Sequence, residues 1–340
     1  MLSLEDLNIN LANYITSKTP NHVVVVTSKL ARQFCLHHLY HLETFDIVEV
    51  ENGDACKTIQ SAAFVWEKLL EYKVNRKSMI IAVGGGSVLD LAGFCASTFM
   101  RGIPIMYIPT TLLSMVDSAE GGKTGINFKG VKNIIGTFQQ ADIILNCPTF
   151  IQTLPRLEIL SGWAEMMKHG ILEGHSLWKT IQNGIPDASD PIWNELIEQN
   201  IQFKQKIVQS DFKEAGPRKL LNLGHTVGHA LEALKLNDPE INHGICVANG
   251  IMIESLIARE IHLCNADFLS EIQRIFNRDF PKITYKKSEI PQLLELIKAD
   301  KKNDIEGIKC TLPNRIGDVE YDVIVPIELI EKVLLNWISV

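Results

Sequence analysis

Short apolar runs alternate with helical patterns through the first half of the chain, and this alternation constrains the fold most. Val23–Thr27 has the sequence VVVVT, which is apolar on both faces and typical of a strand buried in a parallel sheet. Helical spacing over Lys29–Tyr40 and Cys56–Tyr72 alternates with further apolar runs at Phe45–Val50 and Ser78–Val83. Strands that alternate with helices predict a parallel sheet with helices on both faces, which binds ligands at the carboxyl ends of its strands.

From about Leu154 the pattern changes to helices. The ranges with helical spacing are Leu157–Leu172, Pro191–Ser210, Lys219–Leu236, His243–His262 and Leu269–Asn277. Near the end, the apolar runs 308–312 and 319–325 could pair as a small hairpin before a last helix. We therefore expect an α/β domain over residues 1–153 and a mainly helical domain over residues 154–340, with the active site in a cleft between them.

The composition excludes several classes of protein. The chain has 340 residues, of which 46% are hydrophobic and 21% are charged, as in a soluble globular protein. Its net charge of −7 argues against a nucleic-acid partner. The seven cysteines form no C-x-x-C pair, which favours reduced thiols and a cytoplasmic location. We expect neither a signal peptide in MLSLEDLNIN nor a membrane span, because no run approaches roughly 20 apolar residues.

The segment Ile80–Asp90, IIAVGGGSVLD, joins an apolar strand to a helix through three glycines. Glycines allow a phosphate to approach the backbone closely, and the N-terminus of the helix, which we expect near Asp90, favours negative charge. The spacing differs from G-x-G-x-x-G, so an ordinary tight turn is the alternative. Asp90 would either cap the helix or bind a ligand hydroxyl.

A second glycine-rich segment, 117–133, contains GGKT at residues 121–124. A phosphate-binding P-loop, G-x-x-x-x-G-K-[ST], would require glycine at position 117, which is Asp117, and a following helix that the pattern does not predict. We therefore exclude a nucleoside-triphosphate site. The segment also contains Lys123, Lys132 and Asn133, and its alternative interpretation is a solvated loop with incidental charges.

Three histidines, His225, His229 and His243, lie close together in the second half. On a helix, the first two are one turn apart and share a face. Glycine destabilises helices, so Gly224 and Gly228, which precede these two histidines, suggest that something approaches closely. The pattern leaves two interpretations open: a metal site, or a buried helix whose histidines bond to neighbouring carbonyls.

On the predicted helix that contains SGWAEMMKHG, residues 161–170, Glu165 shares a face with Lys168 and His169. The helix is apolar nearly all round, so we expect Glu165 to be buried and to need a partner. That partner would be a metal ion or Lys168. The alternative is an ordinary surface ion pair, which stabilises little.

Taken together, these segments resemble the 3-dehydroquinate synthases of the sugar phosphate cyclase family. The segments that carry the resemblance are ENGDACK, GGGSVLDLAGFCASTFMRG, PTTLLSMVDSAEGGKTGINFKGVKNIIG, TLPRLEILSGWAEMMKHGIL, KEAGPRKLLNLGHTVGHALE and NHG. The resemblance implies a Rossmann-like α/β domain that binds NAD and a helical domain that binds a divalent metal ion, usually zinc, with cobalt as an alternative. It also implies a homodimer.

The resemblance assigns residues to each group. The implied metal ligands are Glu165, His225 and His243. The residues implied to contact NAD are Gly53, Asp54, Lys57, Gly85, Gly86, Ser87, Asp90, Thr110, Thr111, Lys123 and Lys132. The implied catalytic and substrate-binding residues are Arg101, Asp117, Lys123, Asn133, Lys168, Lys204, Arg218, Asn222 and His229. A basic residue of Asp300–Lys302 would join them.

The implied reaction converts 3-deoxy-D-arabino-heptulosonate 7-phosphate to 3-dehydroquinate and phosphate, a step of the shikimate pathway of aromatic amino acid biosynthesis. A ring hydroxyl is oxidised, phosphate is eliminated, the hydride returns, and ring opening with an aldol closure gives the carbocycle. Net redox change is zero, so the enzyme would be a carbon–oxygen lyase. A basic pocket for phosphate would explain the convergent lysines of an acidic chain.

Three positions depart from the family pattern: Leu89 replaces glycine, Glu120 replaces a small or apolar residue, and Ile245 replaces glutamate. These departures leave another sugar phosphate cyclase as an alternative. A metal-dependent alcohol dehydrogenase of the glycerol dehydrogenase type is a second alternative, because GGGSVLD also fits its cofactor turn. Glu165 and Lys168 favour the synthase, since the dehydrogenases resemble a pattern of aspartate followed four residues later by histidine. A non-catalytic NAD-binding regulator would need neither three histidines nor these lysines.

Overall fold

The computed structural model describes residues 2–42, 44–236, 238–299 and 307–339. The chain divides into two compact units. The first comprises Met1–Pro155 and Asp187–Ile201, and the second comprises Arg156–Pro186 and Gln202–Val340. The segment Asp187–Ile201 thus groups with the first unit, although it lies in the range that we expected in the second domain.

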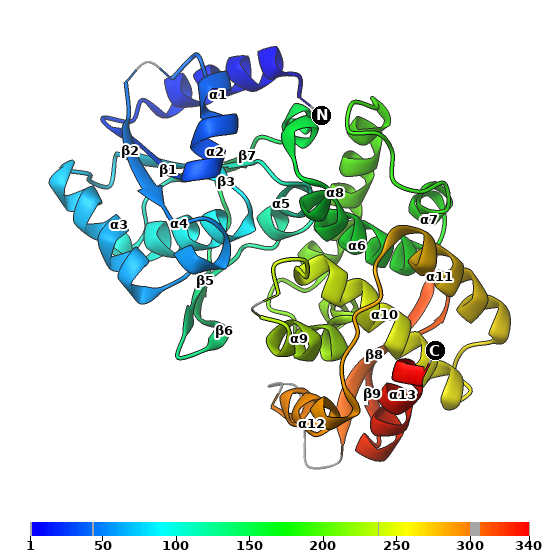
Figure 1. The fold of residues 1–340 in the computed structure, drawn as a ribbon. Coiled ribbons are helices and arrows are strands. Elements are labelled where there is room, and N and C mark those ends of the chain that lie inside the picture. Colours follow the sequence, from blue (N-terminus) through cyan, green and yellow to red (C-terminus); the bar gives the residue numbers. More distant parts are fainter. Residues whose placement is uncertain (1, 43, 237, 300–306, 340) are drawn as a thin grey trace. The chain divides into compact units, whose positions relative to one another are not determined.

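A parallel sheet forms the middle of the first unit (Figure 1). Its strands lie in the order β2 (Asp46–Val50), β1 (Val23–Ser28), β3 (Met79–Gly84), β4 (Ile105–Pro109) and β7 (Ile143–Ile144). Every neighbouring pair is parallel. Helices α1 (Leu4–Lys18) and α2 (Lys29–Phe34) lie on one side, and α3 (Ile59–Glu71) and α4 (Gly86–Thr98) lie on the other (Figure 1). The predicted Rossmann-like α/β fold is therefore confirmed.

The sheet is held by apolar burial on both faces. β1 and β3 are buried along their whole length, which explains why their sequences show no alternation of apolar and polar residues. Val24, Val26, Ile80 and Ala82 belong to one core cluster with residues of α3 and α4. Full burial of such aliphatic side chains stabilises by roughly 1.5–3 kcal/mol each for valine or isoleucine. The carboxyl ends of β1 and β3 are therefore rigid supports for the turns that follow them.

The glycine-rich segment 117–133, for which a solvated loop was the alternative interpretation, runs into a β-hairpin, so that alternative was wrong. β5 (Lys123–Phe128) pairs antiparallel with β6 (Val131–Phe138). The two residues between them, Lys129 and Gly130, both have positive φ, 47° and 80°, as in a type I′ hairpin turn. α5 (Leu112–Val116) and the 3-10 helix Ser118–Glu120 precede the hairpin in the chain. The first unit also contains the 3-10 helices Gly53–Cys56 and Phe99–Arg101.

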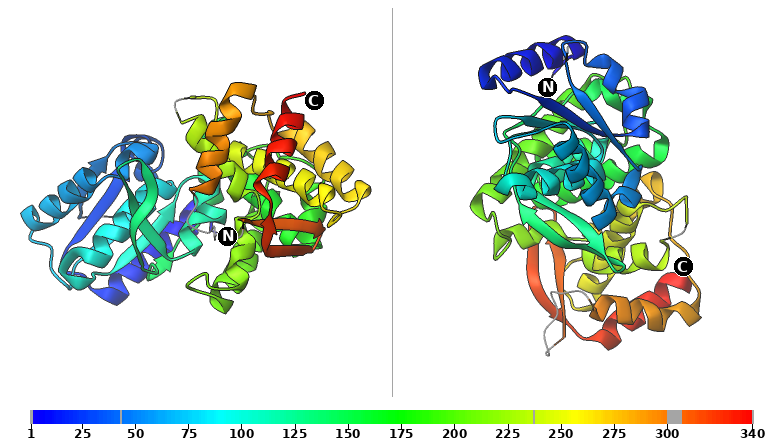
Figure 2. Two further views of the ribbon diagram at one scale, coloured as in Figure 1. Left: turned by 90° about the horizontal axis from the view of Figure 1, so that it is seen from below. Right: turned by 90° about the vertical axis from the view of Figure 1, so that its left-hand side faces the viewer.

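The second unit is mainly helical, as predicted. Its elements in the described ranges include α6 (Arg156–Glu173), α7 (Ser176–Ile181), α9 (His225–Leu234), α10 (His243–Glu260), α11 (Ala266–Asp279), α12 (Ile290–Lys298) and α13 (Ile327–Ser339). α8 (Ile192–Ser210) contributes to both units. The predicted hairpin is present as β8 (Ile308–Arg315) and β9 (Asp318–Val325), drawn in orange-red in Figure 2. None of the helices in these ranges is both long and apolar enough to pass through a bilayer.

The expected continuous helix Lys219–Leu236 is broken. Residues Pro217–Asn222 form a 3-10 helix, and α9 begins only at His225. Gly224 lies between the two, in a left-handed conformation with φ 80° that a side chain would strain. The break places His225 in the first turn of a new helix.

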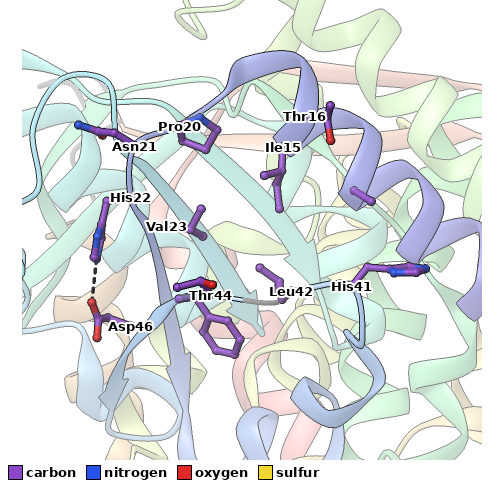
Figure 3. A pocket seen from close by; sticks show the side chains of 12 residues that line it. Ile15, Thr16, Pro20, Asn21, His22, Val23, His41, Leu42, Thr44 and Asp46 are labelled. Atoms are coloured by element: carbon purple, nitrogen blue, oxygen red, sulfur yellow. Dashed lines mark hydrogen bonds and ion pairs between the residues drawn. The ribbon is translucent and has the colours of Figure 1, made fainter.

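One pocket of about 500 Å³ lies beside α1, at the amino ends of β1 and β2 (Figure 3). Ile15, Val23 and Leu42 line it. His22 and Asp46 also line it, and Nε2 of His22 lies 2.7 Å from Oδ2 of Asp46. The carboxyl ends of the strands, where ligands bind in open parallel sheets, are at the opposite edge. This pocket is therefore separate from the candidate cofactor turn.

Candidate active site

Glycines allow α6, α9 and α10 to pack backbone against backbone. A Cβ on Gly250 of α10 would lie 2.0 Å from the carbonyl oxygen of Gly224, at the start of α9. A Cβ on Gly228 would also meet the backbone of α10, at 3.0 Å. A Cβ on Gly244 of α10 would lie 2.3 Å from the carbonyl oxygen of Ser161 on α6. The close approach predicted beside the histidines is thus the approach of a neighbouring helix.

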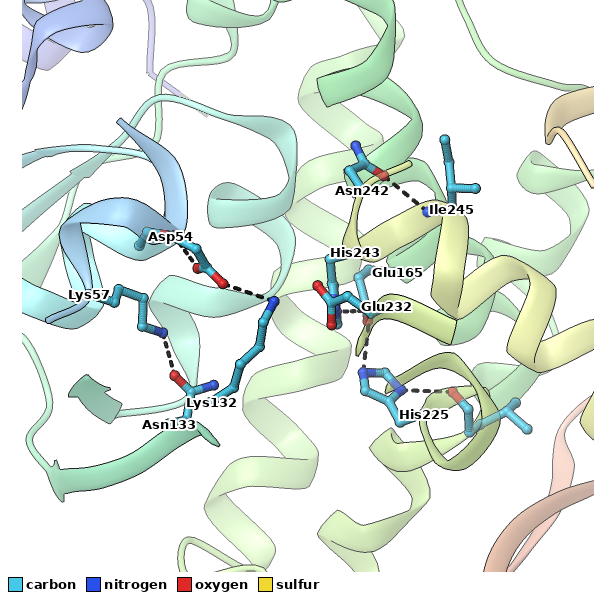
Figure 4. Close-up of polar contacts among 12 residues, drawn as sticks. Asp54, Lys57, Lys132, Asn133, Glu165, His225, Glu232, Asn242, His243 and Ile245 are labelled. Carbon is cyan, nitrogen blue, oxygen red and sulfur yellow. Dashed lines mark hydrogen bonds and ion pairs between the residues drawn. The ribbon is translucent and has the colours of Figure 1, made fainter. Parts of the chain in front are cut away.

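These crossings bring together Glu165 of α6, His225 of α9 and His243 of α10 (Figure 4). The Nε2 atoms of His225 and His243 lie 3.6 Å and 3.5 Å from Oε1 of Glu165. One ligand atom from each residue lies within 4.8 Å of the others. Two imidazoles and a carboxylate at this spacing could hold a divalent cation.

The Nδ1 atoms of both imidazoles, here called the outer nitrogens because they face away from Glu165, have partners of their own. Nδ1 of His225 lies 3.0 Å from the carbonyl oxygen of Leu223, and Nδ1 of His243 lies 3.4 Å from Oε2 of Glu232. With a proton on each Nδ1, each Nε2 would offer its lone pair to an ion held beside Glu165. Metal-binding histidines are held in this way, by a carbonyl or a carboxylate on the other nitrogen. The donor set therefore fits a divalent metal ion.

Burial and neighbouring charges shift the pKa values of His225 and His243 in opposite directions. Burial, and then the ammonium of Lys168, hold the pKa of His225 well below its usual value. Burial would also lower the pKa of His243, but the carboxylates of Glu165 and Glu232 outweigh it and raise that pKa to about 10. A proton on His243 thus balances two carboxylates in the metal-free chain. A divalent cation would replace that positive charge on binding.

Glu165 and Lys168 form a buried ion pair within α6, with side chains 1% and 2% exposed. The expected burial of Glu165 is confirmed, and one of its two expected partners is Lys168. An ammonium ion that is buried this deeply is retained only beside negative charge. Lys168 is therefore fixed next to the candidate metal ligands, and His169 is buried on the same helix.

The other candidate residues of the second unit have these positions. His229 is exposed on α9, with its ring centroid 5.1 Å from that of His225. Lys204 is buried on α8. Arg218 is buried and donates from its guanidinium to the carbonyl oxygen of Phe212 at 2.7 Å. The side-chain amide of Asn222 donates to Glu214 at 2.7 Å.

In the first unit, the three-glycine turn follows β3, and the predicted order of strand, turn and helix is confirmed. Gly84 ends the strand, Gly85 is the N-cap, and α4 begins at Gly86 rather than near Asp90. A Cβ on Gly86 would lie 2.6 Å from Oγ of Ser118. The turn sits where the strand order changes between β1 and β3, the usual place for a nucleotide in such a sheet. Its backbone and the helix N-terminus could hold a phosphate.

Beside this turn, Lys57 joins α4 to the hairpin, and Figure 4 shows its contact with Asn133 of the hairpin. Its Nζ lies 2.5 Å from Oδ2 of Asp90 and also donates to Oδ1 of Asn133. Asp90 therefore pairs with a buried lysine from within α4 and does not cap the helix, which was one of its two possible roles. Binding of a ligand hydroxyl, the other role, stays a prediction. Lys132 pairs with Asp54 at 2.9 Å, and Ser87 donates to Asp54 at 3.0 Å.

The remaining candidates of the first unit have these positions. Gly53 begins a 3-10 helix with φ 60°. Thr110 is buried, and Thr111 caps α5 by accepting from the backbone of Ser114. Arg101 and Lys123 are exposed, and Asp117 is partly buried at the end of α5. Residues Asp300–Lys302 lie outside the described part of the chain.

Sequence reasoning missed two glutamates. Glu232 contacts His243, and its position seven residues after His225, on the same helix face, was a signal that could have revealed it. Glu254 is fully buried in α10 and accepts from the backbone nitrogens of Gly224, at 2.5 Å, and Val227, at 3.1 Å. A single glutamate in the apolar run IMIESLIA indicated a buried acceptor role, here the capping of α9.

The three departures from the family pattern have distinct surroundings. Leu89 is buried in α4 among the core residues that face the sheet. Glu120 is partly exposed at the end of a 3-10 helix. Ile245 is buried in α10, and its backbone nitrogen donates to Oδ1 of Asn242 at 3.1 Å. Two of the three substitutions thus place apolar side chains in the interior.

Comparisons with known proteins show the family of the chain. Residues 47–161 match the model of the 3-dehydroquinate synthase N-terminal family, and residues 162–303 match that of the C-terminal family. The chain is 38% identical over 333 residues to the 3-dehydroquinate synthase of Pyrococcus furiosus, covering 96% of this chain and 94% of the relative.

Several solved structures share this fold. A 2-deoxy-scyllo-inosose synthase complexed with carbaglucose-6-phosphate, NAD+ and Co2+ has a TM-score of 0.85 at 20% identity, over 97% of this chain and 94% of that one. The 2-epi-5-epi-valiolone synthase of Streptomyces hygroscopicus, with NAD+ and Zn2+ bound, has a TM-score of 0.81 at 24% identity, over the same shares. An iron-containing alcohol dehydrogenase of Corynebacterium glutamicum is less similar, with a TM-score of 0.65 at 15% identity over 97% and 91%.

Proposed function

Because the chain belongs to the 3-dehydroquinate synthase family, we propose that it converts 3-deoxy-D-arabino-heptulosonate 7-phosphate to 3-dehydroquinate and phosphate. The observation that carries the proposal is the convergence of two imidazole Nε2 atoms on Oε1 of Glu165, with Lys168 paired to the same carboxylate. A carboxylate, two histidines and a buried lysine suit a reaction in which an alcohol loses its hydroxyl proton and the hydride of the same carbon, and phosphate is then eliminated.

NAD and a divalent metal ion would take part in the proposed reaction. NAD bound at the Gly85–Gly86 turn would accept and return a hydride, and a divalent ion, zinc or cobalt, held by Glu165, His225 and His243 would act as a Lewis acid on the substrate hydroxyl. The turn fits a dinucleotide because its glycines expose backbone N–H groups at the start of α4. The histidine pair fits the ion because both outer nitrogens already have acceptors.

The side chains of the first unit would hold the cofactor. Lys57 is buried and anchored by Asp90, so its ammonium has a fixed position beside the turn. Asp54 is held by Lys132 and Ser87, and we propose that its carboxylate accepts from ribose hydroxyls. Oriented groups of this kind fix the nicotinamide relative to the reacting carbon.

The cationic side chains would bind the substrate. Phosphate and carboxylate are best recognised by arginine and lysine, through short charge-assisted hydrogen bonds. The set that we propose for this role is Arg101, Lys123, Lys168, Lys204 and Arg218, with the polar Asp117, Asn133, Asn222 and His229. Lys168 would in addition hold negative charge that develops next to the metal ligands, because its position is fixed by Glu165.

We also propose that the protein is a carbon–oxygen lyase that acts as a homodimer in the cytoplasm. Regeneration of NAD in each turnover makes the net reaction an elimination and cyclisation. All seven cysteines are free and buried, as in a reducing compartment. Dimerisation follows the resemblance to the synthases and would be measured by light scattering.

The proposal is tested by a comparison of substrates. The purified protein, loaded with NAD and zinc, is given the heptulosonate phosphate or glucose 6-phosphate, the parent of the analogue bound to the inosose synthase. We expect kcat/KM for the heptulosonate phosphate to exceed that for glucose 6-phosphate by orders of magnitude, because only the former offers a carboxylate to the cationic set. Preference for glucose 6-phosphate would assign the chain to another cyclase. Turnover of glycerol would assign it to the dehydrogenases.

A further inference from the structure

The carboxylate of Glu232 lies behind His243, on the side away from Glu165 (Figure 4). It is 14% exposed, and its Oε2 is 3.4 Å from Nδ1 of His243. We propose that Glu232 is a positioning residue that orients the His243 ring and thereby sets the affinity for the divalent metal ion. The inference rests on the proposed metal site and deepens it.

His243 is the member of the site whose ring most needs such support. Its side chain is 30% exposed, whereas those of His225 and Glu165 are 12% and 1% exposed. His225 is fixed by the carbonyl oxygen of Leu223, in its own chain segment. His243 is the first residue of α10, where no preceding turn of helix packs against its ring.

The residue before His243 fixes the start of α10, and the ring of His243 is oriented by its own side-chain contacts. Asn242, the N-cap of α10, accepts from the nitrogen of Ile245 and donates to the carbonyl oxygen of Leu157 at 2.7 Å. In the described part of the chain, the ion pairs of His243 are with Glu165 and Glu232. Ile245, at the position where the resemblance leads us to expect glutamate, offers no carboxylate. Glu232 therefore orients the outer nitrogen.

Glu232 could instead be a ligand, since His229, Glu232 and His243 also form a group with ligand atoms within 4.8 Å. The two nitrogens of one imidazole point in different directions, however. An ion on Nε2 faces Glu165, and an ion on Nδ1 would face Glu232 and lose both Glu165 and His225. Both groups offer two histidines and a carboxylate, but the first contains the buried Glu165, whereas the second contains the exposed His229. The less exposed group is the better zinc site, which leaves Glu232 in the supporting position.

The test measures zinc binding without substrate. Glu232→Ala and Glu232→Gln are compared with wild type and with Glu240→Gln, which removes an equal charge from the exposed loop before α10. Competition with a chromogenic chelator gives the dissociation constant for zinc. We expect it to rise about 10–100-fold in Glu232→Ala, less in Glu232→Gln, whose amide oxygen can still accept, and not at all in Glu240→Gln. The visible spectrum of the cobalt-loaded variants should keep its shape, because the ligand set is unchanged.

Each contrary result has a distinct meaning. Zinc affinity within twofold of wild type in Glu232→Ala would overturn the inference. A changed cobalt spectrum in Glu232→Gln would make Glu232 a ligand and would also overturn it. If Glu232→Ala fails to fold, the zinc dissociation constants of Glu232→Gln and Glu240→Gln are compared. The inference then requires weaker zinc binding in Glu232→Gln than in Glu240→Gln, and equal binding would overturn it. If wild type binds zinc as expected but forms no 3-dehydroquinate, the proposed function fails while the role of Glu232 stands.

Discussion

Gly250 packs so closely against Gly224 that a Cβ on Gly250 would lie 2.0 Å from the carbonyl oxygen of Gly224. Real Cβ atoms do not approach so near, so the crossing of α9 and α10 at this point excludes every other residue. The same crossing sets the distance between His225, at the start of α9, and His243, at the start of α10. Backbone packing and ligand geometry are thus coupled.

Gly250→Ala should therefore lower both stability and zinc affinity. The added methyl group forces the two helices apart, and overpacking of this kind costs about 1–3 kcal/mol or more in the free energy of unfolding. Urea denaturation and chelator competition measure the two effects. Gly228→Ala is the comparison, because a Cβ there would lie 3.0 Å from the nearest backbone atom of α10, so both losses should be smaller. Equal stability of Gly250→Ala and wild type would contradict the coupling.

Replacing a metal ligand should abolish metal binding. Single substitutions of Glu165, His225 or His243 by alanine should lower zinc content, measured by atomic absorption after dialysis, from about one ion per chain to near zero, because the set has three protein ligands. His229→Ala should lose activity but keep its zinc. A His243→Ala protein with full zinc content would refute the assignment, as would zinc lost only in His229→Ala.

The buried and exposed ion pairs of the first unit should differ in their effect on stability. Asp90→Asn leaves the 5%-exposed side chain of Lys57 without its carboxylate. Loss of one partner of a buried pair costs about 3–5 kcal/mol, and we expect the lower end because Asp90 is 21% exposed. Asp54→Asn, the matched control, breaks the pair with Lys132, whose side chains are 44% and 39% exposed, and should cost below about 1 kcal/mol.

The free energies of unfolding of Asp90→Asn and Asp54→Asn are measured by urea denaturation of the metal-free, cofactor-free protein. NAD affinity, measured by calorimetry, should fall in both variants, because both carboxylates are proposed to organise the cofactor site. Asp54→Asn would then lose NAD affinity with little loss of unfolding free energy, which shows that the loss of NAD binding does not come from unfolding. Losses of unfolding free energy that are equal in the two variants would contradict the ranking by burial.

Asp211 should control substrate binding through the loop before Arg218. Its carboxylate accepts from the backbone nitrogens of Gly216 at 2.7 Å, Ala215 at 3.0 Å and Arg218 at 3.2 Å. The bond from Gly216, followed by the others, holds the pKa of Asp211 below its usual value against the opposing effect of burial. Since the folded-state pKa is lowered, this stabilisation is present above the unfolded-state pKa of roughly 4 and is lost as pH falls through the folded-state pKa.

Asp211→Ala should raise KM for the heptulosonate phosphate by about tenfold or more, because three backbone donors lose a charged acceptor and the Arg218 loop loosens. The affinity for NAD should stay unchanged. Asp190→Asn is the control, since Asp190 accepts from the backbone nitrogen of Ile192 at 2.9 Å in a loop that contains no candidate residue. An unchanged KM in Asp211→Ala would show that the loop needs no such anchor.

Periodicity predicted most of the fold because the patterns were long. β1 and β3 are apolar throughout, and α10 is buried almost all round, so both were visible as unbroken apolar segments. The β5–β6 hairpin was missed because its turn, Lys129–Gly130, lacks the usual Asn-Gly or Asp-Gly signal. The break at Gly224 was missed because it is imposed by packing against α10, which local spacing does not report.

The candidate site was predictable where a residue type itself requires a partner. A glutamate in an apolar helix and histidines one turn apart pointed to Glu165 and His225. The pairing of Asp90 with Lys57 was not predictable, because it joins residues 33 positions apart through the tertiary fold. The contact between Glu232 and His243 depends likewise on how α9 crosses α10, so spacing could suggest Glu232 but could not identify its partner.

The most direct measurement follows phosphate, 3-dehydroquinate and NADH together in one reaction of the purified protein with zinc, the heptulosonate phosphate and an amount of NAD far below that of the substrate. Our account predicts equimolar phosphate and 3-dehydroquinate over many turnovers per NAD, with no accumulation of NADH, because the hydride returns in each cycle. Formation of NADH in step with product, or an end of the reaction after a single turnover per NAD, would contradict it.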